Sequence, residues 1–158
     1  MLVYRLLRPD ETDAAARQHR LAGALIPGFD PNLRSLDETS AFYREVFAKG
    51  PIWGAFDSAT LAGHMALEPG WIEHLYVDPG RQGKGIGRAL IAIAQRDHND
   101  LQLWTYQANV RARSTYECAG FIAEEYGFDP EHEDPVPNVR YRWQARRRRN
   151  DQVTECDA

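Results

Sequence analysis

The sequence predicts a single α/β domain with a central twisted, mixed but mostly antiparallel sheet of about six or seven strands, flanked by about four helices. The chain has 158 residues, of which 43% are hydrophobic and 27% charged, and this is typical of one soluble globular domain with a buried core. Strand-like and helix-like segments alternate in the order β-α-α-β-β-β-α-β-α-β-β. No internal repeat or linker-like stretch indicates a second domain.

Boundary residues support the predicted elements. Ser35 and Glu38 form a capping box at the start of the second helix, and Gly50-Pro51 ends that helix. Asp57 to Thr60 has the composition of a hairpin turn. The predicted strands are 2–8, 52–56, 61–67, 71–77, 101–106, 121–128 and 137–145, and the predicted helices are 9–22, 35–49, 85–97 and 109–118.

A glycine-rich turn, Gln82-Gly83-Lys84-Gly85-Ile86-Gly87, separates the strand that ends at Val77 from the next helix. Glycines let the backbone approach phosphate oxygens closely, and the first amides of a helix point at the same spot. Lys84 and Arg88 add positive charge nearby. The turn is therefore predicted to bind a phosphate or pyrophosphate group.

Two common nucleotide motifs do not fit this turn. A Walker loop requires glycine where Asp78 stands and serine or threonine where Gly85 stands. A dinucleotide fingerprint counted from Gly83 would place Arg88 at its third glycine. The turn therefore belongs to neither class.

Two sequence blocks together resemble the GCN5-related N-acetyltransferase (GNAT) superfamily. Gln82-x-x-Gly85-x-Gly87 is similar to that family's acetyl-CoA motif (Gln/Arg-x-x-Gly-x-Gly/Ala). The segment Asn109-x-x-Ala112-Arg-x-x-Tyr116-Glu-x-x-Gly120-Phe121 is similar to its second block and stands at the expected distance from the first. The blocks span about residues 75–121, and the element order over residues 2–145 is also similar.

The resemblance implies that acetyl-CoA is the co-substrate and that the sheet is splayed where it binds. The end of the strand at 71–77 would pair with the pantetheine arm like an added strand, and the turn would hold the pyrophosphate. The implied cofactor-binding residues are Leu75, Tyr76, Val77, Gln82, Gly83, Lys84, Gly85, Ile86, Gly87, Arg88, Asn109 and Tyr116. Asn109 could equally serve as a helix cap alone.

The implied reaction is direct attack of a primary amine on the thioester within a ternary complex. By resemblance, Tyr116 would protonate the departing coenzyme A sulfur, and a backbone amide near Leu75 to Val77 would stabilise the oxyanion. Glu73 is the first candidate for the general base, acting directly or through water. His74, which faces the other side of a regular strand unless a bulge turns it, and His64 are alternatives.

The acceptor should be an amine of a small molecule or peptide, with a cationic one favoured. The loop Ile26 to Arg34, the helix after Ser35 and three aromatic residues (Trp53, Phe56 and Trp71) could form an aromatic, acidic cleft for it. Core packing is the alternative for the three aromatic residues, and the sequence favours it. The acidic segment Gly127 to Pro137 could line its entrance. Two alternatives stay open, which are a transferase that uses a larger acyl-CoA and a catalytically silent coenzyme A-binding sensor or interaction module. A homodimer would be in keeping with the family.

Charge is unevenly distributed along the chain. There are 19 cationic and 23 acidic side chains, yet residues 140–149 hold six arginines and no acid. The body is thus strongly acidic, which disfavours nucleic acid as a partner, although the Arg146–Arg149 run could be an anion-binding patch. We expect an acetyltransferase domain over residues 1–145 and a disordered tail over 146–158. The sequence predicts no metal site, no membrane segment and a cytoplasmic location.

Overall fold

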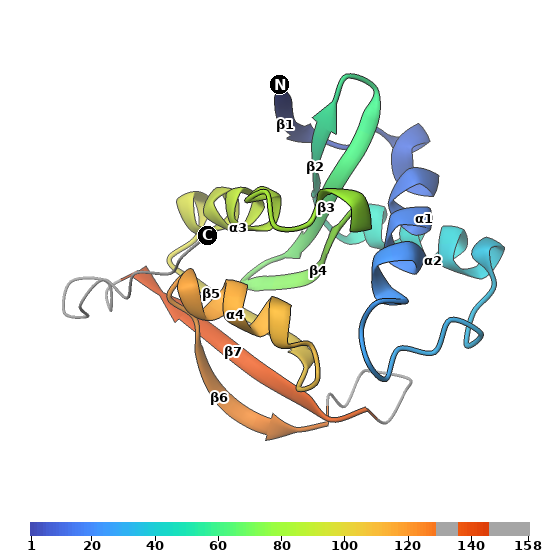
Figure 1. The fold of residues 1–158 in the computed structure, drawn as a ribbon. Coiled ribbons are helices and arrows are strands. Elements are labelled where there is room, and N and C mark those ends of the chain that lie inside the picture. The colour runs from blue at the N-terminus through green and yellow to red at the C-terminus, as the bar shows by residue number, and fades with distance from the viewer. Residues whose placement is uncertain (129–135, 146–158) are drawn as a thin grey trace.

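The computed structural model describes residues 1–128 and 136–145. It contains a seven-stranded mixed sheet with four α-helices, in the element order that the sequence predicts (Figure 1). The strands are β1 (Leu2–Leu6), β2 (Ile52–Asp57), β3 (Thr60–Glu68), β4 (Trp71–Val77), β5 (Asp100–Tyr106), β6 (Ile122–Gly127) and β7 (Asn138–Gln144). The helices are α1 (Thr12–Gly23), α2 (Leu36–Lys49), α3 (Ile86–Asp97) and α4 (Val110–Cys118), with short 3-10 turns at Pro9–Glu11 and Pro79–Arg81.

The sheet has the strand order β1-β2-β3-β4-β5-β7-β6 and consists of two antiparallel halves. The halves meet at β4 and β5, which run parallel and register only at Trp71 and Gln102. Beyond that point the two strands diverge, and Figure 1 shows the wedge that opens between them. The predicted splay of the sheet is confirmed, and it separates the edges of two strands that would otherwise pair.

Helices cover both faces of the sheet and give it two hydrophobic cores. One core lies under α1 and α2 and includes Ala15, Tyr43 and Ile52. The larger core lies under α3 and continues to α4, where it includes Leu90 and Tyr116. Because α1 and α2 pack against β3 and β4, side chains from all four elements can meet at one end of the wedge.

Local sequence rules set the start of α2 as predicted. The Ser35 hydroxyl accepts from the Glu38 amide at 3.1 Å, and the Glu38 carboxylate accepts from the Ser35 amide at 3.2 Å. This reciprocal pair satisfies two amides that the helix itself cannot. It fixes the end of α2 from which Thr39 and Phe42 reach the wedge.

Two of the six clustered arginines belong to the sheet rather than to a basic tail. Arg142 on β7 pairs with Asp100 on β5 at 2.6 Å, and Arg140 lies 3.2 Å from both Glu124 and Glu125 on β6. The predicted tail with its Arg146–Arg149 run lies outside the described residues, as does most of the acidic segment at 127–137. Over the described parts of the chain, no helix is long and apolar enough to cross a membrane.

Candidate functional site

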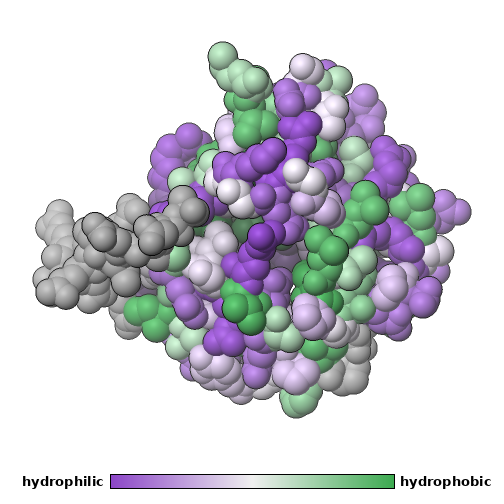
Figure 2. Space-filling view, in the orientation of Figure 1, coloured by the Kyte–Doolittle hydropathy of each residue, from purple (hydrophilic) through white to green (hydrophobic). Residues whose placement is uncertain are grey.

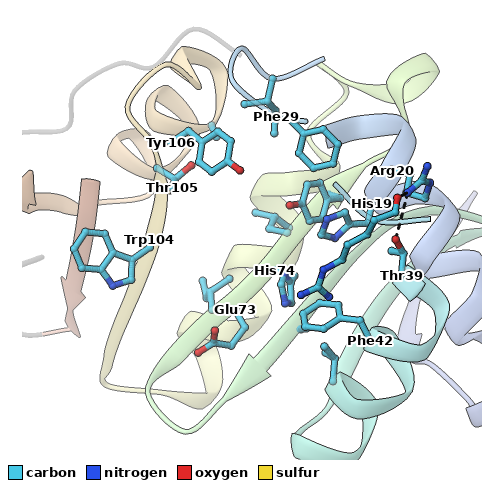
Figure 3. Close-up of a pocket in the computed structure, with 18 of the residues that line it drawn as sticks. His19, Arg20, Phe29, Thr39, Phe42, Glu73, His74, Trp104, Thr105 and Tyr106 are labelled. Carbon is cyan, nitrogen blue, oxygen red and sulfur yellow. Dashed lines mark hydrogen bonds between the residues drawn. The ribbon is translucent and has the colours of Figure 1, made fainter. Parts of the chain in front are cut away.

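A cleft of about 740 Å³ lies where β4 and β5 separate. Residues of α1, α2, β3 and β4 line one side, and residues of β5 and α4 line the other. Figure 3 shows Glu73 and His74 on β4 across the opening from Trp104 and Tyr106 on β5. In the space-filling view, this face is recessed near its centre, and both polar and apolar side chains reach the rim (Figure 2).

The predicted phosphate-binding turn sits just beyond the C-terminal end of β4. Gly83 and Gly85 have φ angles of 78° and 82°, a conformation that strains any residue with a Cβ. A Cβ added at either position would meet nothing within 4 Å, so both glycines border open space. The two glycines therefore allow the backbone to adopt these angles, and they leave room beside the turn for a ligand.

The start of α3 presents unpaired amides at this turn. Gly85 is the N-cap and has no side chain to accept from the helix, and the first intrahelical bond runs from the Ala89 amide to the Gly85 carbonyl. The amides of Ile86, Gly87 and Arg88 precede that bond and have no partner within the helix. With the positive end of the helix dipole and exposed Lys84, they form a site suited to an anion.

Gln82 ties the turn to both halves of the wedge. Its amide nitrogen donates to the Val77 carbonyl at 3.3 Å, and its amide oxygen accepts from Arg111 on α4. The turn is also anchored from below, since Arg81 pairs with Asp57 at 2.8 Å. Both polar atoms of the Gln82 side chain are therefore used to hold the backbone of the turn in place. The groups available to a phosphate are the backbone amides.

The end of β4 offers one backbone edge to the wedge. Leu75, Tyr76 and Val77 register with Met65, His64 and Gly63 of β3 on their other edge. Within residues 1–128 and 136–145, no strand pairs with these three residues on the β5 side. An extended ligand can therefore add to this edge as a strand would.

Asn109 and Tyr116, two of the predicted cofactor-binding residues, line the cleft from the α4 side. Asn109 caps α4, its side-chain oxygen accepting from the Ala112 amide at 3.2 Å, and it also lines the cleft. Tyr116 is 6% exposed and packs with Phe121 and Tyr141 at ring distances of 5.8 and 6.1 Å. Burial raises the pKa of the Tyr116 phenol, so the hydroxyl that borders the cleft keeps its proton at neutral pH.

A β-bulge decides where Glu73 and His74 point. The β3–β4 register runs from Ala66 opposite His74 to Leu67 opposite Ile72, which leaves Glu73 as the extra residue. Both Glu73 and His74 consequently line the cleft, and His74 stacks near Tyr76 with ring centroids 6.4 Å apart. The sequence left this bulge as an open alternative, and the structure contains it.

His64 lies behind the cleft wall and is fully buried. Its Nε2 lies 2.8 Å from the Tyr43 hydroxyl, and its Nδ1 lies 2.7 Å from the side-chain oxygen of Gln18. Burial lowers the pKa of His64 well below the ordinary value of 6.5. A ring enclosed in this way cannot touch an acceptor in the cleft directly.

His19 is a cleft residue that the sequence reasoning missed. It lies on α1, and its Nδ1 is 2.8 Å from the same Tyr43 hydroxyl that His64 contacts. Its ring packs against Tyr76 at 4.3 Å and against His74 at 5.8 Å. A histidine on a helix far from the glycine-rich turn has no sequence neighbour that marks it, and only its placement beside β4 reveals it (Figure 3).

The aromatic residues expected around the acceptor divide between cleft and core. Trp71 lines the cleft, together with Phe29 from the predicted loop and Phe42 from α2. Trp53 instead packs on the core with Arg96 over its ring at 6.0 Å, and Phe56 is buried, 3.7 Å from the Arg5 guanidinium. Core packing, the alternative that the sequence favoured for the aromatic residues, holds for these two, because both lie on β2, one strand further from the wedge than β3.

Together, the wedge, the edge of β4 that faces it and the amides of α3 form a cleft with the shape and donors that an extended, phosphate-bearing ligand requires. Residues 48–123 match a family model described as an acetyltransferase (GNAT) domain. The matched stretch contains both sequence blocks that resemble this family.

Individual known proteins are similar to this chain in sequence or in fold. A mycothiol acetyltransferase from Beutenbergia cavernae is 36% identical over 111 residues, which are 63% of this chain and 33% of that protein. The chain therefore spans about a third of the length of this curated relative. A GNAT-family protein from Desulfovibrio desulfuricans superposes with a TM-score of 0.70 at 23% identity, covering 92% of this chain and 99% of that one. The Salmonella typhimurium protein yncA, determined with its cofactor acetyl-CoA, gives 0.71 at 16% identity, covering 100% and 99%.

Proposed function

We propose that this protein is an acetyl-CoA-dependent N-acetyltransferase that acetylates a primary amine of a small molecule or peptide. One observation carries the proposal: an edge of β4 that no described strand covers leads from the glycine-rich turn at 82–88 to the cleft where Tyr116 lies. The family supports acyl transfer from acetyl-CoA, and the geometry supports a reaction in which both substrates are bound together.

The residues present fit coenzyme A. The amides at the start of α3, with Lys84 and Arg88, would hold the pyrophosphate, and the edge of Leu75 to Val77 would pair with the pantetheine arm. Asn109 and Tyr116 would contact the cofactor from α4. When bound, acetyl-CoA supplies the thioester carbonyl that the amine attacks.

Tyr116 is the proposed acid. Its raised pKa keeps the hydroxyl protonated, so it can deliver a proton to the sulfur as the carbon–sulfur bond breaks. A backbone amide in the stretch from Leu75 to Val77 would stabilise the oxyanion, since a fixed dipole needs no reorganisation during the reaction. Glu73, on the rim of the same cleft, would attract the ammonium group or take its proton through water.

The charge of the cleft favours a cationic acceptor. Its lining includes five carboxylates and three cationic side chains: Asp30, Glu38, Glu45, Glu68 and Glu73 against Arg20, Arg34 and Lys49. Phe29, Phe42 and Trp71 add aromatic faces that attract ammonium groups. We therefore expect an amine that carries positive charge over one that carries a carboxylate.

Release of free thiol from acetyl-CoA, measured across a panel of amines, tests this function. Tyr116→Phe should lower kcat about 10²–10⁴-fold while leaving the Kd for acetyl-CoA nearly unchanged. Tyr126→Phe is the matched control, since Tyr126 is 60% exposed on β6 and should have no effect. Tight binding of acetyl-CoA without thiol release for any amine would favour a silent binding module, and unchanged kcat in Tyr116→Phe would remove Tyr116 as the acid.

The cofactor site has its own test by calorimetry. Gly85→Glu places a carboxylate in the open space beside the turn and should weaken acetyl-CoA binding at least 100-fold. Gly127→Glu, which adds the same charge on β6 where an added Cβ also meets nothing within 4 Å, should bind normally. Equal affinities in the two variants would show that the turn does not hold the pyrophosphate.

A further inference from the structure

We infer that His19 is the general base of the proposed reaction, held in the required tautomer by hydrogen bonds through Tyr43, His64 and Gln18. The inference rests on the proposed N-acetyltransferase function and assigns a step within it. It places the base on α1, across the cleft opening from the β5 side chains, and makes the three buried residues positioning residues.

The hydrogen-bonded chain connects three elements. The Gln18 side-chain nitrogen donates to the Leu61 carbonyl at 3.0 Å, and its oxygen lies 2.7 Å from His64 Nδ1. His64 Nε2 is 2.8 Å from the Tyr43 hydroxyl, which is 2.8 Å from His19 Nδ1. Gln18, Tyr43 and His64 are each no more than 5% exposed, so water does not compete for these contacts.

The end of the hydrogen-bonded chain at the Leu61 carbonyl determines which group donates and which accepts at every step. The Leu61 carbonyl can only accept, so the Gln18 amide nitrogen faces it and the amide oxygen faces His64. His64 must then carry its proton on Nδ1. Its low pKa keeps it neutral, which leaves Nε2 as an acceptor for the Tyr43 hydroxyl.

The Tyr43 hydroxyl determines which nitrogen of His19 carries the proton. Burial raises the pKa of the Tyr43 phenol well above 10.0, so it remains a neutral hydroxyl that gives its one proton to His64. Its oxygen can then only accept, and His19 must donate from Nδ1. The neutral His19 ring consequently carries its lone pair on Nε2, the nitrogen turned away from Tyr43.

This arrangement suits a base that gains and loses a proton in every turnover. His19 donates from Nδ1 to Tyr43 both as imidazole and as imidazolium, so protonation at Nε2 breaks no hydrogen bond in the chain. Imidazole is the side chain whose ordinary pKa, about 6.5, suits proton transfer near neutral pH.

The proton balance closes for the proposed reaction. His19 takes one proton from the ammonium group, and the free amine then forms the nitrogen–carbon bond. As the carbon–sulfur bond breaks, the sulfur takes the proton of Tyr116, and Tyr116 recovers one from the amide nitrogen through water. The products are the amide, free thiol and one proton, which His19 releases.

The described groups that contact His19 or line the cleft with it come from several elements. Phe29 and Arg34 belong to the loop before α2, Arg20 to α1, and Glu73, His74 and Tyr76 to β4, with Tyr43 and His64 beneath. Glu73 is exposed at the rim, where water screens its charge. The tautomer of His19 follows from hydrogen bonds that end on the Leu61 main-chain carbonyl.

Kinetics of His19→Gln test the base role separately from a structural one. Glutamine can still donate to Tyr43 but accepts no proton at neutral pH, so kcat should fall about 10²–10⁴-fold with little change in KM for acetyl-CoA. The acidic limb of the kcat/KM profile should disappear, and added imidazole should partly restore the rate of His19→Ala. His98→Gln, at the end of α3, should retain full activity. Full kcat and an unchanged pH profile in His19→Gln would overturn the inference while leaving the proposed function intact.

Nitrogen-15 spectra of the histidine rings provide a second test that needs no acceptor. We expect His19 and His64 both in the Nδ1–H tautomer at pH 8, and we expect Tyr43→Phe to abolish that preference at His19. Tyr43→Phe should also lower kcat about 3–10-fold, as expected for loss of one hydrogen bond. His19 in the Nε2–H tautomer in the unmodified protein would refute the inference whatever the acceptor.

Discussion

The hydrogen-bonded ion pair between Arg5 on β1 and Glu11, just before α1, allows a quantitative prediction. The Glu11 carboxylate accepts two hydrogen bonds from Arg5 at 2.7 and 2.9 Å and one from the Arg8 amide at 2.7 Å. These bonds hold the pKa of Glu11 at about 2, compared with 4.5 for a free side chain, with the Arg5 contact as the largest cause. Glu11→Gln keeps the shape of the side chain and removes its charge.

The magnitude follows from linkage between protonation and folding. Each unit of pKa difference corresponds to about 1.4 kcal/mol, so the difference at Glu11 would contribute about 3 kcal/mol if solvent did not intervene. The Glu11 side chain is 14% exposed but that of Arg5 is 37% exposed, and screening reduces the contribution. We expect Glu11→Gln to lower the free energy of unfolding by about 1–2 kcal/mol at pH 7.

The contribution of Glu11 to the free energy of unfolding should decrease as the pH falls. A carboxylate whose pKa is depressed by folding stabilises the protein above its unfolded pKa of 4.5, and this stability is lost as the pH falls toward 2. Urea unfolding of both proteins at pH 7 and pH 3 should therefore show the difference shrink by more than half. Glu125→Gln is the control, because Glu125 is 57% exposed and should contribute less than about 0.5 kcal/mol. A difference for Glu11→Gln that is equal at both pH values would refute the electrostatic explanation.

Two further predictions concern buried positions. His64 stays neutral in the folded protein, whereas the unfolded chain binds a proton at this residue below about pH 6.5. The free energy of unfolding should therefore fall on acidification by at most about 1.4 kcal/mol per pH unit. Urea titrations should show a shallower dependence of this free energy on pH for His64→Gln and an unchanged one for His98→Gln. A Cβ at Gly50 would overlap the Leu67 carbonyl oxygen, so Gly50→Ala should destabilise by more than about 2 kcal/mol, whereas Gly127→Ala should be nearly neutral in thermal unfolding. Equal melting temperatures for the two alanine variants would contradict this packing argument.

The sequence alone determined the features that depend on neighbouring residues. The capping box at Ser35, the order of the elements and the path of the turn at 82–87 all follow from hydrogen bonds and backbone angles within a few positions of the chain. The spacing of Asn109 and Tyr116 likewise places both on one short helix after β5. Local chemistry was sufficient here because each feature is complete within a single element or turn.

Only the tertiary structure decided the features that need distant segments. Gln18, Tyr43 and His64 are 21 to 46 positions apart along the chain, and their hydrogen bonds form because α1 and α2 pack on β3. The extra residue in β4 that brings both Glu73 and His74 to the cleft is likewise a property of its pairing with β3. Strand order also placed Trp53 and Phe56 on β2, with β3 and β4 between them and the wedge, and alternation along the chain could not show this. Periodicity fixes which face a side chain occupies within its own element, whereas contacts between elements depend on how the sheet and helices pack in space.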